Sequence, residues 1–145
     1  MRILGLDVGD RRIGVAVSDE SCTLSTPIEV IERKDDEHTM VHLKEIISNY
    51  DISEIVVGLP KGMDGENSEQ TRKVYSFIVL VKREIKLPIK LWDERLTTVM
   101  AEKVLIKANM RRNNRKGIID KLSASIILQN YLDNKKDDLT TEDRE

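Results

Sequence analysis

Residues 3–19, ILGLDVGDRRIGVAVSD, constrain the fold more than any other stretch of the chain. Two runs rich in Val, Ile and Leu, Ile3–Val8 and Ile13–Ser18, flank the polar break Gly9–Arg12, which has the length of a hairpin loop. The pattern predicts two antiparallel strands. Asp7 is the one charged residue of the first run, so a strand that is otherwise apolar must accommodate a carboxylate.

The surroundings of Asp7 follow from the alternation of side chains between the two faces of a strand. Residues expected on the face of Asp7 are Ile3, Gly5 and Gly9, and those expected on the opposite face are Leu4, Leu6 and Val8. The two glycines leave open space around the carboxylate. An aspartate that precedes glycine in a turn also commonly accepts backbone hydrogen bonds, so Asp7 taken alone favours a structural role.

The rest of the chain predicts an α/β domain with a mixed sheet. Short apolar runs predict further strands at Pro27–Glu32, Glu54–Leu59 and Ile89–Asp93. Apolar residues at helical spacing predict helices over about 39–50, 74–85, 100–108 and 118–131. Three antiparallel strands followed by parallel strands with crossover helices give a sheet with helices on both faces.

Length and composition limit the classes of protein that the chain can belong to. At 145 residues it matches one domain, expected over 1–134, with 135–145 as a polar, disordered tail. Basic and acidic residues nearly balance, so the net charge predicts no partner. Cys22 is the single cysteine, no basic and apolar leader precedes Ile3, and no apolar run has a membrane helix's length. We therefore expect a cytoplasmic protein.

Further acidic residues could share a site with Asp7. Asp93 and Glu94 stand at the carboxyl end of a predicted strand, where ligands of open α/β sheets usually bind. Asp120 stands in the first turns of an otherwise apolar helix. Each has a structural interpretation as well, since the first two could lead into a helix and Asp120 could favour a helix dipole. The residues alone leave the choice between Asp93 and Glu94 open.

Electrostatics favours a divalent cation if these carboxylates share a cleft. Two carboxylates about 4 Å apart repel by roughly 4 kcal/mol at an effective dielectric near 20. Oxygen ligands suit Mg²⁺ or Mn²⁺, whereas the histidine pair His38 and His42 falls opposite the apolar face of its helix and is expected at the surface. Hard cations held by acidic side chains are typical of phosphodiester hydrolysis.

A basic run close to Asp120 fits a polyanionic substrate. It carries a local charge of +6 in a chain that totals −2, and its members are Lys103, Lys107, Arg111, Arg112, Arg115 and Lys116. Such a run is more often a solvated segment, but its place directly ahead of Asp120 suits a track for phosphates. Because aromatic residues are few, we expect recognition of backbone or shape rather than base stacking.

The segments GLDVGDRRIGVAVSD, VVGLPKGMDG, WDERLTT and RRNNRKGIIDKLSASIILQNYLD resemble the YqgF-type family of pre-16S rRNA nucleases, also described as Holliday-junction-resolvase-like. The resemblance spans Ile3–Asp133 with order and spacing retained. It implies a ribonuclease H-like fold and a nuclease in which Asp7, Glu94 and Asp120 are catalytic and bind Mg²⁺ or Mn²⁺. It thereby selects Glu94 over Asp93.

The resemblance also implies that Arg12, Arg95 and Thr98 line the site, and that the loop over 60–71 flanks it. The chain departs from the family pattern in this loop at Ser68 and Thr71, which leaves its role open. The last helix departs as well, with Ser123 and Ser125 where alanine is usual, a change that should leave Asp120 in place.

Three function classes follow. The favoured one is a metal-dependent nuclease that processes the 5′ end of the small-subunit rRNA precursor, with ribosomal particles as further partners. Within the same nuclease class, resolution of four-way DNA junctions is the nearest alternative. A non-catalytic RNA-binding assembly factor is the second class, and a nucleotide-binding protein is the third. A nucleotide-binding protein is disfavoured, because proteins with a similar first strand pair close two such domains over the nucleotide, and the chain carries no GxxxxGK[ST] loop.

Overall fold

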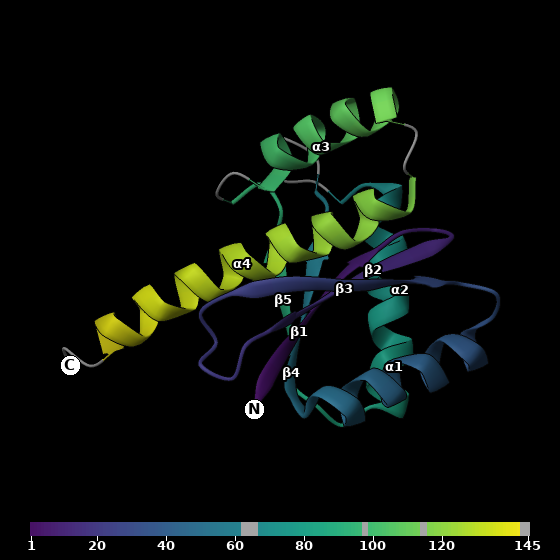
Figure 1. Cartoon of the computed structure of the whole chain (residues 1–145). Helices are drawn as coiled ribbons and strands as arrows, with labels where there is room; N and C mark the ends of the chain where they lie inside the picture. The colour runs from purple at the N-terminus through teal and green to yellow at the C-terminus, as the bar shows by residue number, and fades with distance from the viewer. Residues whose placement is uncertain (62–66, 97–98, 114–115, 143–145) are drawn as a thin grey trace.

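A five-stranded mixed sheet forms the centre of the molecule, in the order β3-β2-β1-β4-β5 (Figure 1). The computed structural model describes the backbone of residues 1–61, 67–96, 99–113 and 116–142, and their side chains except those of 110–113, 116–120 and 136–142. The strands are β1 (Arg2–Val8), β2 (Arg12–Ser18), β3 (Ser25–Glu32), β4 (Ile52–Leu59) and β5 (Ile89–Asp93). The first three pair antiparallel, and β4 and β5 run parallel to β1.

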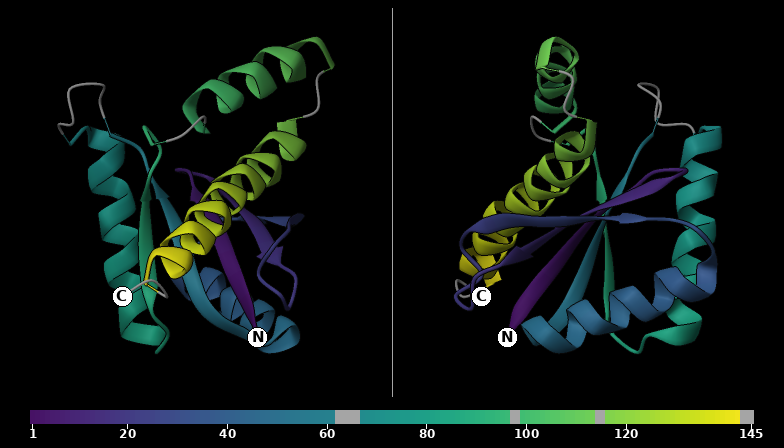
Figure 2. Two further views of the ribbon diagram at one scale, coloured as in Figure 1. Left: turned by 90° about the vertical axis from the view of Figure 1, so that its left-hand side faces the viewer. Right: turned by 45° about the vertical axis from the view of Figure 1, so that its right-hand side comes forward.

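Helices cover both faces of this sheet, as Figure 2 shows. The helices are α1 (Asp36–Tyr50), α2 (Glu69–Glu84), α3 (Val99–Asn113) and α4 (Lys116–Glu142). The larger hydrophobic cluster joins α1 and α2 to one face, and a smaller cluster joins α4 to the other. The helix α3 packs against α4 beyond the end of the sheet. The predicted fold class is therefore confirmed.

The alternation predicted for the first strand is also confirmed. Leu4, Leu6 and Val8 belong to the larger cluster, whereas Ile3 belongs to the smaller one. On the α4 side, Gly5 lets the helix approach closely, because a Cβ built there would stand 2.7 Å from the Cβ of Leu128. Asp7 shares this face, so the carboxylate points to the layer that α4 covers.

Several boundaries differ from those expected. The helix α1 begins before residue 39, because the carboxylate of Asp35 caps it by accepting a hydrogen bond from the backbone N–H of His38 (2.8 Å). The helix α4 continues through Glu142, over most of the segment expected as a disordered tail, and Lys135 pairs with Glu54 of β4 (2.8 Å). Among the described residues, no helix combines the length and the apolar character that a bilayer crossing requires.

Candidate functional site

Two acidic residues far apart in the chain meet at the carboxyl ends of the parallel strands. Asp7 lies near the end of β1, and Glu94 directly follows β5, where its backbone N–H donates to the carbonyl of Leu59 (3.1 Å). Both line a pocket of about 370 Å³. The residues that line this carboxylate pocket are Asp7, Val8, Gly9, Pro60, Gln70, Glu94, Lys103, Lys107 and Ser123.

Glu94 is the most enclosed of the charged groups in the carboxylate pocket, since only 4% of its surface is exposed. Gly58 in β4 makes room for it, because a Cβ at that position would stand 3.1 Å from the Oε2 of Glu94 and 2.5 Å from the Cδ1 of Ile127. Burial raises the pKa of the Glu94 carboxyl, and the neighbouring charge of Asp7 adds to the rise, while Lys103 opposes it. The site thus holds a carboxylate where its charge requires compensation.

Lys103 of α3 supplies that compensation. Its Nζ donates to the Oε1 of Glu94 at 2.7 Å and to the Oδ1 of Asp7 at 3.3 Å. The Lys103 side chain is 16% exposed, and that of Asp7 is 18% exposed. Burial acts to lower the pKa of the Lys103 ammonium, but the attraction of the two carboxylates outweighs it, so the pKa is raised. One ammonium therefore bridges two carboxylates in the same pocket and offsets part of their combined negative charge.

Two polar side chains complete the described walls of the carboxylate pocket. Ser123 of α4 is buried, and its hydroxyl has no hydrogen-bond partner among the described residues. Gln70 in the first turn of α2 donates from Nε2 to the carbonyl of Val8 (3.3 Å). The pocket therefore combines acceptors, donors and charge at the end of the sheet, as a polar ligand requires.

The loop that precedes α2 ends in a reciprocal cap. The Ser68 hydroxyl accepts from the backbone N–H of Thr71 (3.2 Å), and the Thr71 hydroxyl accepts from the backbone N–H of Ser68 (3.0 Å). The Thr71 hydroxyl also donates to the carbonyl of Pro60. Residues 62–66 of the loop lie outside the described part of the chain. Ser68 and Thr71, the two positions at which the chain departs from the family pattern in this loop, thus fix the start of α2 beside the pocket.

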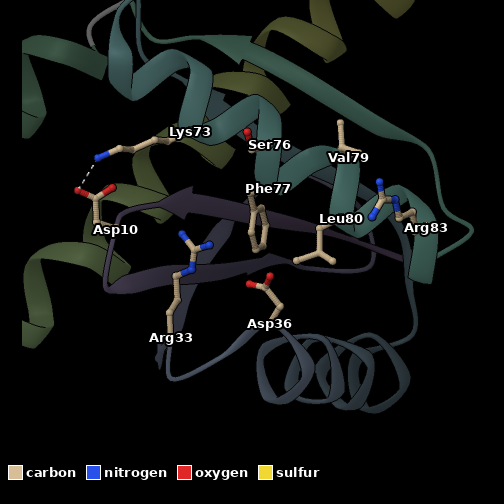
Figure 3. A pocket seen from close by; sticks show the side chains of 9 residues that line it. All are labelled: Asp10, Arg33, Asp36, Lys73, Ser76, Phe77, Val79, Leu80 and Arg83. Carbon is tan, nitrogen blue, oxygen red and sulfur yellow. Dashed lines mark hydrogen bonds and ion pairs between the residues drawn. The ribbon is translucent and has the colours of Figure 1, made fainter.

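A second pocket, of about 550 Å³, is lined by Asp10 of the turn that follows β1 and by residues of α2 (Figure 3). Asp10 pairs with Lys73 at one end of it (3.3 Å), and the Arg33 side chain extends toward the ring of Phe77. The Arg33 guanidinium also donates to the carbonyl of Gly9 (2.7 Å). This contact braces the turn that holds Asp7 in place.

Comparison with protein families decides the family of the chain. The model of the family described as "RuvX: Holliday junction resolvase" matches residues 1–134. The chain belongs to the RuvX family. It is 53% identical over 133 residues to a protein of Desulforamulus reducens and 51% identical over 132 residues to one of Halothermothrix orenii, both named "Putative pre-16S rRNA nuclease". The matches cover 92% and 91% of this chain and 97% and 94% of those proteins.

Solved structures place this RuvX chain in the RuvC-like, ribonuclease H-like fold. The structure of T. thermophilus RuvC in complex with a Holliday junction substrate has a TM-score of 0.58 at 12% identity, and 94% of this chain and 96% of that chain are covered. The complex of the fowlpox virus resolvase with Holliday junction DNA gives 0.55 at 11% identity, with coverages of 92% and 98%. At these identities the likeness concerns the fold.

In this RuvX chain, Glu94 and not Asp93 lies beside Asp7. Asp93 instead accepts hydrogen bonds from the guanidinium of Arg95, the shortest of them 2.7 Å long, and these bonds lower the pKa of the Asp93 carboxyl. Arg12 donates from Nε to Glu32 of β3 (3.3 Å). Neither Arg12 nor Arg95 is among the described residues that line the carboxylate pocket.

The remaining predicted site residues have no described side chains. Thr98 and Arg115 lie outside the described residues, and the side chains of Arg111, Arg112, Lys116 and Asp120 are not described either. The backbone of Asp120 lies in α4, three residues before the pocket residue Ser123. Positions three apart lie on one face of a helix, so the carboxylate pocket and position 120 are close along α4.

The sequence prediction missed the role of Lys103. It counted Lys103 within the basic run that faces phosphates, whereas the structure pairs this lysine with Asp7 and Glu94. A signal was present in the spacing, because Val99, Lys103 and Lys107 stand four residues apart on one face of α3 and Val99 is fully buried. Gln70 and Ser123 gave no comparable signal.

Proposed function

We propose that the chain is a divalent-metal-dependent nuclease that hydrolyses phosphodiester bonds and processes the 5′ end of the 16S rRNA precursor. The observation that carries the proposal is the meeting of Asp7 and the buried Glu94 in one pocket. Relatives about half identical over nearly their whole length are named as nucleases of this precursor. Such a substrate would place the protein in the cytoplasm, with structured RNA or ribosomal particles as partners.

Two carboxylates in the pocket suit a divalent cation, although the described residues form no group of three ligand side chains. The ammonium of Lys103 already stands as a positive charge between the two carboxylates, which is evidence that the pocket favours a cation. The donors of Asp7 and Glu94 are oxygens, which suit Mg²⁺ or Mn²⁺. Asp7 and Glu94 would hold the ion, with Asp120 as the third ligand. When bound, the ion supplies an activated water and neutralises charge on the phosphate.

The chain's own side chains would bind and orient the substrate. The hydroxyl of Ser123, which has no partner among the described residues, would donate a hydrogen bond to a phosphate oxygen in the carboxylate pocket. Lys107 lines the same pocket and adds positive charge. Arg111, Arg112, Arg115 and Lys116 continue the basic run, and with Arg12, Arg95 and Thr98 they would contact the nucleic-acid backbone.

A four-way DNA junction is the second candidate substrate. The family model is described as a Holliday junction resolvase, and the fold is shared with proteins whose structures contain junction DNA. The favoured RNA substrate rests on relatives about half identical, whereas these structures are about one tenth identical. Both substrates call for the same chemistry in the same pocket.

The test is cleavage of two labelled substrates by the purified chain. A precursor RNA with the 5′ flank of 16S rRNA and a synthetic four-way junction are each incubated with Mn²⁺, with Mg²⁺ and with chelator. We expect metal-dependent cleavage of the RNA, and none after Asp7→Asn or Glu94→Gln. Cleavage of the junction alone would favour the resolvase function.

Asp10→Asn is the matched control. Asp10 is three residues from Asp7, but its carboxylate pairs with Lys73 in the second pocket. The Asp10→Asn variant should therefore cleave the RNA as the unmodified chain does. Binding of the RNA without cleavage under every metal condition would instead support a non-catalytic assembly factor.

A further inference from the structure

The position of Lys103 between the carboxylates points to a role in ion binding. We propose that Lys103 is the resident cation of the carboxylate pocket: it positions Asp7 and Glu94 when no divalent ion is bound, and an entering ion must expel it. The inference rests on the proposed metal-dependent function. It adds a residue, outside the predicted ligands, that sets how tightly the ion binds.

The geometry carries the first step. Both carboxylates bond to the same nitrogen, at 2.7 Å and 3.3 Å, so their bonded oxygens are no more than about 6 Å apart. Lys107, one turn further along α3, lines the pocket, yet no hydrogen bond or ion pair joins it to either acid among the described contacts. Lys103 alone of this pair therefore occupies the space between the acids.

The second step is mutual exclusion. A divalent ion approaches carboxylate oxygens to about 2.0–2.2 Å and repels a neighbouring ammonium. The Nζ of Lys103 stands within hydrogen-bond distance of the oxygens that such an ion would use. Only the form of the protein in which Lys103 has moved away from the two carboxylates can thus accept the ion. The apparent affinity for the ion is the intrinsic affinity multiplied by the fraction of molecules in that form.

The third step concerns α3. Val99 at its start is buried, but Val104 and Leu105 are 65% and 70% exposed, and α3 stands at the end of the sheet beside α4 (Figure 1). Among the described contacts, the packing of Val99 and the bonds of Lys103 connect α3 to the sheet. Expulsion of Lys103 would break these bonds and link ion binding to the helix that carries part of the basic run.

The experiment measures Mn²⁺ binding by calorimetry and by the electron paramagnetic resonance of free Mn²⁺, without substrate. Lys103→Met should bind Mn²⁺ about tenfold more tightly than the unmodified chain, because no side chain has to leave. Lys103→Arg keeps the charge and should stay within about threefold of the unmodified chain. Lys107→Met is the matched control: it removes a charge that acts on Glu94 but bonds to neither acid in the described contacts, so it should tighten binding less than Lys103→Met does, and an equal gain would overturn the inference.

The outcomes separate the inference from the function on which it rests. Unchanged or weaker binding by Lys103→Met, with normal binding by the unmodified chain, overturns the inference and leaves the metal site standing. No binding by either protein overturns both. Adding Asp7→Asn to Lys103→Met should abolish the gain, and a retained gain would place the ion elsewhere and overturn the inference. If Lys103→Met does not fold, Lys103→Gln, which lacks the charge that repels the ion, replaces it and should also bind Mn²⁺ more tightly than the unmodified chain.

Discussion

At the scale of single residues, two adjacent carboxylates have opposite environments. Asp93 accepts hydrogen bonds from Arg95 near the surface, and its pKa is lowered. Glu94 is buried beside Gly58, and its pKa is raised. Although Asp93 and Glu94 are neighbours in the sequence, one forms an ion pair near the surface and the other is a residue of the pocket.

The Asp93 pair predicts a small stability effect that depends on pH. Because the pKa of Asp93 in the folded chain lies below its ordinary value of 3.8, its contribution is present above pH 3.8 and is lost as the pH falls through the lower value. Asp93→Asn should lower the free energy of unfolding by about 0.5–1 kcal/mol at pH 7, and by less at pH 3.

Urea denaturation at both pH values measures this difference, and a double-mutant cycle with Arg95→Gln tests its cause. A loss of equal size at pH 7 and pH 3 would rule out the ion pair as the cause. Cleavage by Asp93→Asn should remain, in contrast to Glu94→Gln.

A side chain at Gly58 is expected to displace Ile127 and Glu94 and so to lower the free energy of unfolding. In Gly58→Ala the new Cβ meets the Cδ1 of Ile127 and the Oε2 of Glu94, so we expect a loss of about 1–3 kcal/mol of unfolding free energy and reduced cleavage. Ile127→Val removes the clashing Cδ1. The double variant should therefore be more stable than the sum of the two single losses predicts, and additive losses would contradict this packing explanation.

At the scale of elements, the cap of α2 fixes one wall of the carboxylate pocket. Ser68→Ala removes the acceptor of the Thr71 N–H and should cost about 1 kcal/mol of unfolding free energy. Ser76→Ala, on the exposed side of the same helix, is the control and should stay within about 0.5 kcal/mol. Thermal unfolding followed by circular dichroism compares the two, and equal losses would exclude a capping role.

Most elements could be predicted because their signals are local. The hairpin of β1 and β2 and the buried run of β4 follow from the alternation and continuity of apolar residues. The start of α1 was missed although its cap, Asp35, is local, whereas the end of α4 was harder because it involves a contact between distant segments. The helix α4 continues past residue 134, where Lys135 forms an ion pair with Glu54. No local sequence pattern predicts this pair, because its two residues are far apart in the chain.

At the scale of the whole molecule, charge is distributed unevenly. The chain totals −2, but the run from Lys103 to Lys116 carries +6, so the remainder is strongly acidic. A polyanion should therefore approach by way of α3 and the start of α4, the elements that contain this run.

This distribution predicts a strong salt dependence of RNA binding. Arg111→Gln with Arg112→Gln should weaken binding and lower the slope of log K against log salt by about 1 for each lost phosphate contact. Lys44→Gln is the control, because Lys44 pairs with Glu84 on the α1 and α2 side. Fluorescence anisotropy over a range of salt concentrations measures both, and an unchanged slope would exclude these arginines from the interface.

The site was predictable in part. The position of Asp7 followed from strand alternation, whereas the choice of Glu94 over Asp93 needed the family resemblance. Their meeting depends on the parallel pairing of β1, β4 and β5, which brings the ends of distant strands together. The spacing of Val99 and Lys103 could place the lysine on the inward face of α3, but which acids it contacts depends on the position of α3 against the sheet, and side-chain periodicity does not predict that position.

The two hydrophobic clusters on opposite faces of the sheet differ in how far their residues can change without affecting the pocket. The smaller one lies under α4, where added atoms at Gly5 and Gly58 would meet Leu128 and Ile127, and where the helix also contributes Ser123 to the pocket. The larger one reaches the pocket through Val8, and the first turn of α2 adds Gln70. A lineage that adapts to a hotter habitat can thus repack the part of the larger cluster away from Val8 with less effect on the pocket than changes under α4 would have.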